Sequence, residues 1–472
     1  MSSLNLLDEH SFYGEWWFSD APDKRFYGEL TYSPKSGIKL IIHTHENVEE
    51  AFIIKNNIIL GELENGKVIT LYKIKSQKIN ISSSDVLRIK KFYSFDFAFI
   101  GKHFLTPNEL MFTNIYTSFT NLLPFFPENK FINTENSEIK IPFQQNFRKK
   151  EIAKFNYGNF KVYFYLSPEL EFSIKSPLHR ELIFRERIDI KIKFSEPKPF
   201  IIDYSIYNYN DFYSVIETLR LFFSFISNQP SYNIYLRSDI GDKKPIDIIA
   251  FTPFANVVLT PHYELVFKYS DIQDKFAKIL ENWFINRINK NLKAIFDIYS
   301  DILYYSNILP VSQFLLIVYA LEAYHRNKFA SQYIPEKDYE EFLKKLRYYI
   351  CNFPKIPTDL KNHLKEMLKY GNEFSLRKRL KDLFLKNNTF IQQVLLEKAD
   401  KKYDEFIDKV VKWRNNLSHG NIYVEKDEEF EIKSLFNILK IILTGYILTE
   451  LGIESSEIKE ILKRIIERNS IF

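Results

Sequence analysis

The hydrophobic periodicity of this chain changes near residue 271, and this change limits the possible folds more than any other feature. Before that point, apolar residues alternate with polar ones in short runs such as 26–32 and 188–194, which is the pattern of half-buried strands. After it, apolar residues recur every three or four positions, as at Ile272, Phe276 and Ile279. We therefore expect an α+β multidomain protein, with β-rich, sandwich-like N-terminal and middle regions followed by an all-α helical bundle.

The length of 472 residues and an ordinary composition predict several folded domains. Hydrophobic residues make up 45% and charged residues 26% of the chain, values that exclude an intrinsically disordered protein. We expect a β-rich domain over residues 1–145, a mixed β/α middle region over 146–299 and a helical domain over 300–472. Prolines set among polar residues indicate a junction at 120–145.

Turn residues divide the β-rich part into hairpins. Segments 26–32 and 38–44 flank a turn with Gly37, and segments 57–63 and 68–72 flank the pair Asn65-Gly66, which suits a tight primed turn. Further strands are expected at 160–165, at 188–194 and between 232 and 270, where 257–259 forms one apolar centre. A single helix is expected at 211–227, opened by Asp211.

Prolines and apolar stripes set the limits of the helices expected in the last part of the chain. These helices lie near 296–306, 311–328, 336–351, 356–370, 374–386, 390–418, 432–450 and 455–468.

Charge and cysteine usage indicate a cytoplasmic protein. The formal net charge of +5 is mildly basic, and it neither requires nor excludes an anionic partner. The single cysteine, Cys351, cannot form an internal disulfide and suits a reducing compartment. The first residues do not resemble a signal peptide, and no run approaches the roughly 18 apolar residues that span a bilayer. We therefore expect no membrane partner.

Arg414 and His419 carry the strongest chemical signal in the chain. They are separated by four residues at the end of an amphipathic segment, and Gly420 follows as an expected helix stop. Histidine titrates near neutral pH, whereas arginine stays charged and binds phosphate oxygens. This pair suits RNA cleavage, in which the 2′-hydroxyl is the nucleophile, so no metal and no cofactor is required. Asn415 is expected to orient the histidine or to bind a phosphate oxygen.

Helical geometry separates these two side chains. A step of five residues turns a regular helix by about 500°, which leaves the side chains roughly 140° apart. Either the last turn deviates or two copies of the motif share one site. The alternative without catalysis is that Arg414 is a surface cation and His419 caps the helix C-terminus.

The C-terminal part of the chain resembles the HEPN domain of ApeA-like anti-phage proteins. The resemblance rests on the R-x-x-x-x-H pattern of HEPN ribonucleases, formed here by Arg414 and His419, and on an upstream helix at 314–326. Gly14, Trp16 and the segments 28–30 and 70–71 likewise resemble the N-terminal domain of ApeA.

This resemblance implies a metal-independent endoribonuclease that acts in a prokaryotic anti-phage defence system of the abortive-infection type. It also implies an RNA substrate, with tRNA as one candidate, and a phage-derived trigger. It further implies a homodimer through the HEPN domain, and we place the dimer contact at about 390–450. The first alternative is a non-catalytic HEPN module for dimerisation or RNA binding. The second is a non-nuclease enzyme located in the β-rich region, for which no catalytic residues are evident.

Other residues are expected to extend or support the site. Lys409 and Lys412 lie near Arg414 and are candidates for RNA binding, and Glu322 is a candidate to approach the motif or to form a surface salt bridge. Trp413 is expected in the core or at a dimer contact. The cations in 377–381 are either a solvated helix face or an RNA contact. His43 and His45 share a strand face but lack a third metal ligand.

Overall fold

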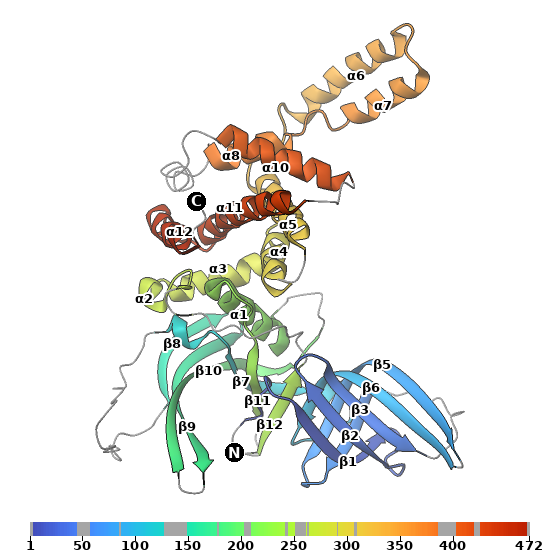
Figure 1. Ribbon diagram of the computed structural model, residues 1–472, viewed down its shortest axis with the longest axis vertical. Coiled ribbons are helices and arrows are strands. Elements are labelled where there is room, and N and C mark those ends of the chain that lie inside the picture. The colour runs from blue at the N-terminus through green and yellow to red at the C-terminus, as the bar shows by residue number, and fades with distance from the viewer. Residues whose placement is uncertain are drawn as a thin grey trace. The chain divides into compact units, whose positions relative to one another are not determined.

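The computed structural model describes residues 3–44, 57–84, 86–126, 149–176, 179–202, 209–240, 244–250, 261, 264–289, 291–305, 309–385, 403–419 and 425–469. The chain divides into two compact units, Met1–Glu281 and Asn282–Phe472. The first is β-rich and the second is helical, which confirms the α+β class. Figure 1 shows the elements of both units.

The first unit contains a 12-stranded antiparallel sheet in the order β3-β2-β1-β4-β5-β6-β12-β11-β7-β10-β9-β8. Its strands are β1 (His10–Phe18), β2 (Phe26–Ser33), β3 (Gly37–Thr44), β4 (Ile58–Leu63), β5 (Val68–Ser84), β6 (Val86–Ile100), β7 (Met111–Phe119), β8 (Lys150–Tyr157), β9 (Phe160–Ser176), β10 (His179–Pro199), β11 (Asn233–Ile240) and β12 (Lys244–Ala250). Both expected hairpins, β2–β3 and β4–β5, are present. Of the strands expected between 232 and 270, residues 251–260 lie outside the described residues.

The first six strands close into a barrel, where the sequence predicted a sandwich-like arrangement. The closure comes from β6, which pairs with β5 on one side and with β3 on the other. In Figure 1 this barrel is the group of blue strands. A long strand such as β6 can serve two neighbours, and its length could not be derived from the short apolar runs in this region.

Trp16 is buried in the barrel and contacts two of its glycines, Gly28 and Gly61. The Trp16 side chain is fully buried, and its Nε1 donates a hydrogen bond to the carbonyl oxygen of Gly28 at 3.2 Å. A Cβ atom on Gly61 would lie 2.5 Å from the Trp16 ring, so a larger residue there would displace the ring. These residues are therefore structural.

Helix α1 (Phe212–Ser227) packs on β7 and β10, and it confirms the helix expected at 211–227. The Asp211 side chain accepts a hydrogen bond from the Ser214 backbone N–H at 2.8 Å, which caps the helix as predicted. Short helices η2 (Pro107–Glu109) and η3 (Leu123–Phe125) also belong to this unit. Phe125 and Phe126 are buried against Phe276, so these two residues are part of the core and not of a linker. Residues 127–145 of the expected junction lie outside the described residues.

The helical elements agree with the expected ranges. They are α2 (Tyr269–Ile272), α3 (Phe276–Ile288), α4 (Lys293–Tyr304), α5 (Pro310–Lys328), α6 (Glu336–Asn352), α7 (Thr358–Leu368), α8 (Leu376–Leu385), α10 (Tyr403–Ser418), α11 (Lys426–Glu450) and α12 (Ser455–Asn469). Helix α3 contains the division between the units. Residues 390–402 of the helix expected at 390–418 lie outside the described residues, as does Gly420.

Helix α11 is the centre of the second unit and packs against α5, α12 and α10. By length and composition, α11 could cross a membrane. Its apolar stretch is therefore longer than we expected of any segment from the sequence. However, 67% of that stretch is buried inside the protein, as expected for the core helix of a bundle.

Candidate functional site

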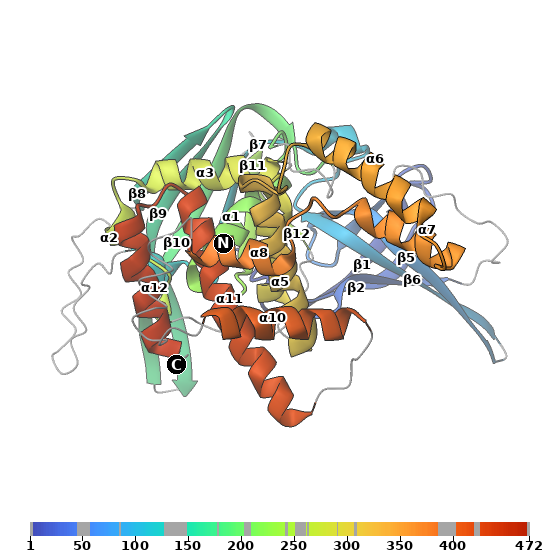
Figure 2. The ribbon, with the colours of Figure 1, turned by 90° about the horizontal axis from the view of Figure 1, so that it is seen from above.

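Arg414, in the last turns of α10, and His419, directly after the helix, both lie off its buried stripe. Its apolar stripe of Ile407, Val410 and Leu417 is buried in the bundle, where α10 contacts α8, α5 and α11 (Figure 2). Arg414 and His419 lie off this stripe, so the guanidinium is partly exposed and the imidazole is exposed. The bundle thus fixes the helix and leaves both functional groups accessible.

The helical hydrogen bonding continues to His419. Its backbone N–H donates to the carbonyl oxygen of Asn415 at 3.1 Å, although the helix itself ends at Ser418. The last turn is therefore regular, and the separation of roughly 140° between the Arg414 and His419 side chains applies to this chain.

The Asn415 side chain contacts the arginine and not the histidine. Arg414 Nη1 donates a hydrogen bond to Asn415 Oδ1 at 3.2 Å. Among the residues that the structure describes, neither Arg414 nor His419 forms an ion pair with a carboxylate. Asn415 therefore orients the Arg414 guanidinium. Because Asn415 is neutral, the positive charge of Arg414 remains available to a phosphate.

The two lysines near the motif differ in their partners. Lys409 Nζ lies 2.7 Å from Glu431 Oε1, and Trp413 Nε1 donates to Glu431 Oε2 at 2.8 Å. These hydrogen bonds from Lys409 and Trp413 hold the pKa of Glu431 below its ordinary value. Lys412 is exposed and forms no ion pair with another described residue. Trp413 is buried within its own chain, as the prediction of a core residue requires.

Glu322 belongs to an ion-pair network and is not brought to the motif. Its Oε1 lies 3.1 Å from Arg326 and 3.9 Å from Arg379. No hydrogen bond or ion pair between described residues joins Glu322 to Arg414 or His419. The salt-bridge interpretation of Glu322 is the one that the geometry supports.

A second arginine–histidine pair, not anticipated from the sequence, lies inside the bundle between α5 and α8. His325 and Arg379 are both fully buried, and His325 Nδ1 lies 3.4 Å from Arg379 Nη1. His325 Nε2 lies 3.6 Å from Asp382 Oδ2. Burial, and then the nearby Arg379 charge, lower the pKa of His325, although Asp382 opposes the shift.

The cations at 377–381 are mostly neutralised within the chain. Arg377 pairs with Asp404 and Asp408, and Lys381 pairs with Asp404. Arg379, predicted to be on a solvated or RNA-facing surface, is instead buried. It sits there because its Nε donates to the carbonyl oxygen of Phe374 at 2.9 Å and its Nη1 donates to Ser331 Oγ at 3.2 Å.

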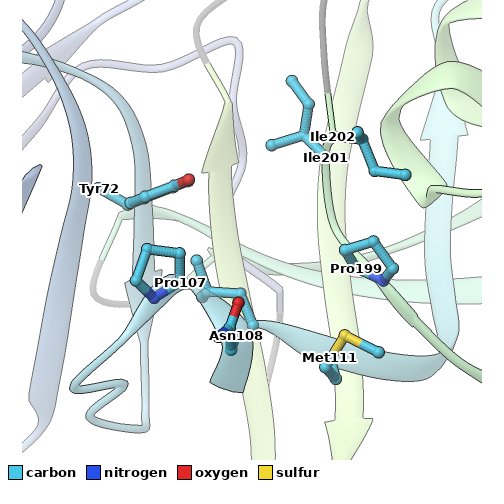
Figure 3. Close-up of a pocket in the computed structure, with 8 residues that line it drawn as sticks. Tyr72, Pro107, Asn108, Met111, Pro199, Ile201 and Ile202 are labelled. Carbon is cyan, nitrogen blue, oxygen red and sulfur yellow. The ribbon is translucent and has the colours of Figure 1, made fainter. Parts of the chain in front are cut away.

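The β-rich unit has an open cavity of about 520 Å³, but it lacks catalytic groups. Figure 3 shows its lining, in which Tyr72 and Asn108 are the polar side chains among proline, isoleucine and methionine. Burial raises the pKa of the Tyr72 phenol, which makes it a weaker acid. The cavity offers no support for the hypothesis of a non-nuclease enzyme in this region.

The described residues contain no group of three or more histidine, cysteine, aspartate or glutamate side chains that could hold a metal ion. His43 is exposed on β3, and His45 lies outside the described residues.

Comparison with known proteins assigns both parts of the chain. Residues 11–283, more than half of the chain, match the ApeA N-terminal domain 1. Residues 315–457 match the Apea-like HEPN domain, a range that contains Arg414, Asn415 and His419. No curated protein and no solved structure matches the chain.

Proposed function

Because the chain belongs to the ApeA family and carries a HEPN domain, we propose that it is a metal-independent endoribonuclease. HEPN domains are typically ribonucleases. The observation that carries the proposal is the position of the partly exposed Arg414 and the exposed His419, which lie at the end of α10 without carboxylate partners among the described residues. Both groups are accessible to a phosphodiester and both retain the chemistry that cleavage needs.

The proposed reaction uses the nucleophile of the RNA itself. His419 accepts the proton of the 2′-hydroxyl, whose oxygen attacks the adjacent phosphorus while the bond from phosphorus to the 5′-oxygen breaks. A histidine returns a proton to the departing oxygen, and the Arg414 guanidinium stabilises the negative charge on the phosphorane. The products are a 2′,3′-cyclic phosphate and a 5′-hydroxyl.

Two chains are expected to build one site. On the regular last turn of α10, Arg414 and His419 diverge by roughly 140°, so one motif is poorly placed to surround a phosphate. A two-fold pairing of the surface around 390–450 would present two arginines and two histidines to one cleft. We therefore propose a homodimer through the HEPN domain.

We place this activity in the cytoplasm, in anti-phage defence of the abortive-infection type. In this proposal a phage-derived component triggers cleavage of cellular RNA, with tRNA as one candidate, and growth stops before the phage multiplies. The family membership supports this role.

The test is cleavage of total RNA by the purified full-length protein, with and without phage lysate, followed by analysis of the new ends. We expect 5′-hydroxyl and 2′,3′-cyclic phosphate ends in the presence of EDTA. His419→Ala and Arg414→Ala should abolish these ends, whereas His43→Ala, which removes an exposed histidine from the other unit, should not. Ends bearing 5′-phosphate, or full activity of either motif variant, would refute the assignment.

A non-catalytic HEPN module remains the second candidate. It predicts that the protein binds RNA or forms a dimer and that no new ends appear under any condition of the same assay.

A further inference from the structure

Helices α6 and α7 form a hairpin that extends from the helical bundle. They pack mainly against each other, and both views show them reaching away from α5, α8 and α11 (Figure 1 and Figure 2). The hairpin is inserted between α5 and α8, and the motif on α10 lies outside it. Its position in the bundle therefore needs a separate explanation.

The base of the hairpin is tightly held. Asn372 Nδ2 donates to the carbonyl oxygen of Ile334 at 2.9 Å, and Asn372 Oδ1 accepts from the Ile334 N–H at 3.1 Å. The Tyr333 and Phe374 rings meet edge to face at 4.7 Å between centroids. These contacts fix the two strands of chain where the hairpin leaves the bundle, so the hairpin is a defined projection.

Charge is segregated along the hairpin. The first part of α6, residues 336–341, contains four acidic residues and one lysine. The distal part, residues 344–365, contains one acidic residue, Asp359, and six cations, which are Lys344, Lys345, Arg347, Lys355, Lys361 and Lys365. The distal half thus carries a formal charge of about +5, in a chain whose whole net charge is +5.

The distal cations are not neutralised by the protein. Among the described residues, none of the six forms an ion pair, in contrast to the paired cations of α8 and to Lys409. Lys361 Nζ donates a hydrogen bond to the carbonyl oxygen of Cys351 at 2.7 Å and so retains its charge. A cluster of accessible like charges without internal partners attracts a polyanion.

Aromatic rings are exposed between these cations. Tyr348 and Tyr349 of α6 are each 68% exposed, and Phe353, which follows the helix, is 57% exposed, so three large rings are accessible within the cationic segment. Lys344 and Tyr348 are four residues apart, as are Lys345 and Tyr349, so each ring lies beside a lysine on the helix surface. Rings placed beside cations form a surface for stacking bases and binding the phosphates that link them.

We propose that the distal half of the α6–α7 hairpin binds single-stranded RNA and holds the substrate of the nuclease. That the bound RNA is the substrate of the nuclease rests on the proposed function. That the hairpin binds RNA rests on the charges and rings of the hairpin alone. Single-stranded RNA fits because its bases are free to stack on Tyr348 and Tyr349 while its phosphates meet the lysines. An acidic protein would satisfy the charges, but it would not require the flat faces of neighbouring tyrosines.

The test measures binding without relying on cleavage. The probe is a fluorescein-labelled 2′-O-methyl oligonucleotide of about 20 nucleotides, whose capped 2′-oxygen cannot act as the nucleophile. Binding to the full-length protein is followed by fluorescence anisotropy over a range of salt concentrations. Light scattering and thermal unfolding of each variant show that its assembly and fold are unchanged.

Two variants remove the surface and two matched variants serve as controls. Tyr348→Ala/Tyr349→Ala should weaken binding about tenfold or more, because one base stacked on an aromatic ring contributes roughly 5- to 150-fold. Lys344→Glu/Lys345→Glu should weaken binding similarly and reduce the slope of log Kd against log salt by about 1.4, or 0.7 for each phosphate contact. The controls are Lys337→Glu, at the acidic end of α6, and Tyr319→Ala, a 60% exposed tyrosine of α5. Both should bind as the unmodified protein does.

The single cysteine provides a local reporter. Cys351 is exposed near the tip of the hairpin, so an environment-sensitive dye can be attached there alone. We expect the oligonucleotide to change the dye emission in the unmodified protein and not in Lys344→Glu/Lys345→Glu. No change at a saturating oligonucleotide concentration would overturn the proposal.

The inference and the proposed function fail in different ways. Unchanged affinity and salt dependence in both hairpin variants would refute RNA binding by the hairpin, even if total RNA is cut normally. A change of oligomeric state with intact RNA binding would show that the surface joins copies of the chain, which also refutes the inference. Loss of binding in the variants, together with no cleavage by the unmodified protein, would support the hairpin and refute the nuclease.

Discussion

Two arginine–histidine pairs occur in the helical unit, and their surroundings give them opposite properties. Arg414 and His419 lie at the accessible end of α10, where the guanidinium donates a hydrogen bond to Asn415 and has no carboxylate partner among the described residues. Arg379 and His325 lie fully buried between α8 and α5, with Asp382 beside the histidine. The first pair is accessible to a ligand, whereas the second contacts only groups of the protein itself. Exposure and the absence of carboxylate partners, rather than residue type, therefore single out a nuclease candidate.

The largest expected effect is a reciprocal one between the two arginines. Arg414→Ala should lower the cleavage rate by about 10²- to 10⁴-fold and leave the stability nearly unchanged, because the side chain is accessible and supports no buried charge. Arg379→Ala should lower the free energy of unfolding by about 3–5 kcal/mol, because Glu322 and Glu373 would lose their buried partner. Initial cleavage rates and urea denaturation of the same preparations measure both effects.

Arg377, a surface arginine of the same helix as Arg379, is the control for the comparison of Arg414 with Arg379. Arg377→Ala breaks ion pairs with Asp404 and Asp408 that are largely exposed, so it should cost about 0–1 kcal/mol. If Arg379→Ala were as mild as Arg377→Ala, or if Arg414→Ala unfolded the protein, the distinction between the two pairs would be wrong.

The sequence predicted the catalytic candidates because their signal is local. Arg414, His419 and the helix that precedes and carries them are adjacent in the chain, so the spacing and the apolar stripe at Ile407, Val410 and Leu417 were sufficient to predict the helix and to name the two candidates, whose catalytic role stays a prediction. The ranges of most helices followed from the same kind of local pattern, since helical hydrogen bonds join residues four apart. These features needed no knowledge of tertiary contacts.

Long-range contacts account for what the sequence did not predict. The burial of Arg379 depends on Ser331 and His325, which lie about 50 positions away, so the run at 377–381 resembled a uniform surface cluster. The barrel depends on β3 pairing with β6, and register between distant strands cannot be deduced from alternation alone. The exposed rings of the hairpin were likewise hidden in a helical pattern, because periodicity does not say which faces of two paired helices stay uncovered.

The second prediction tests whether the accessible pair works across two chains. Mixing Arg414→Ala with His419→Ala chains should restore a measurable part of the cleavage that each lacks alone, because a mixed dimer contains one intact arginine and one intact histidine in the same cleft. In a mixture of Arg379→Ala and His419→Ala chains, the cleavage rate should be no higher than the average of the rates of the two separate variants. A monomeric protein with full nuclease activity would rule out the shared site.

The third prediction concerns the pH dependence of the buried pair. Because the pKa of His325 is lowered in the folded state, the unfolded chain binds the proton more readily between that lowered pKa and about 6.5. Stability should therefore fall as the pH decreases below about 6.5. His325→Gln should flatten this part of the profile, whereas His363→Gln, which removes an exposed histidine of α7, should not. Thermal unfolding midpoints of the unmodified protein and of both variants, measured between about pH 5 and pH 7, test this prediction.

The smallest expected effect separates the two lysines beside the accessible pair. Lys412 is exposed without an ion-pair partner among the described residues, whereas the Lys409 ammonium lies 2.7 Å from Glu431 Oε1. Lys412→Ala should therefore reduce the slope of log Kd against log salt for RNA by about 0.7, which is the value for one phosphate contact to a single strand.

Lys409→Ala should change this slope less, since Glu431 already neutralises the ammonium, and Trp413 would still hold Glu431 through its Nε1 hydrogen bond. Anisotropy titrations of both variants with the 2′-O-methyl oligonucleotide give the two slopes directly. A larger effect for Lys409 than for Lys412 would mean that RNA displaces Glu431 from its lysine. In that case the ion pairs of the free protein would not indicate which cations bind phosphate. The argument that separates Arg414 and His419 from Arg379 and His325 by their partners would then lose its basis.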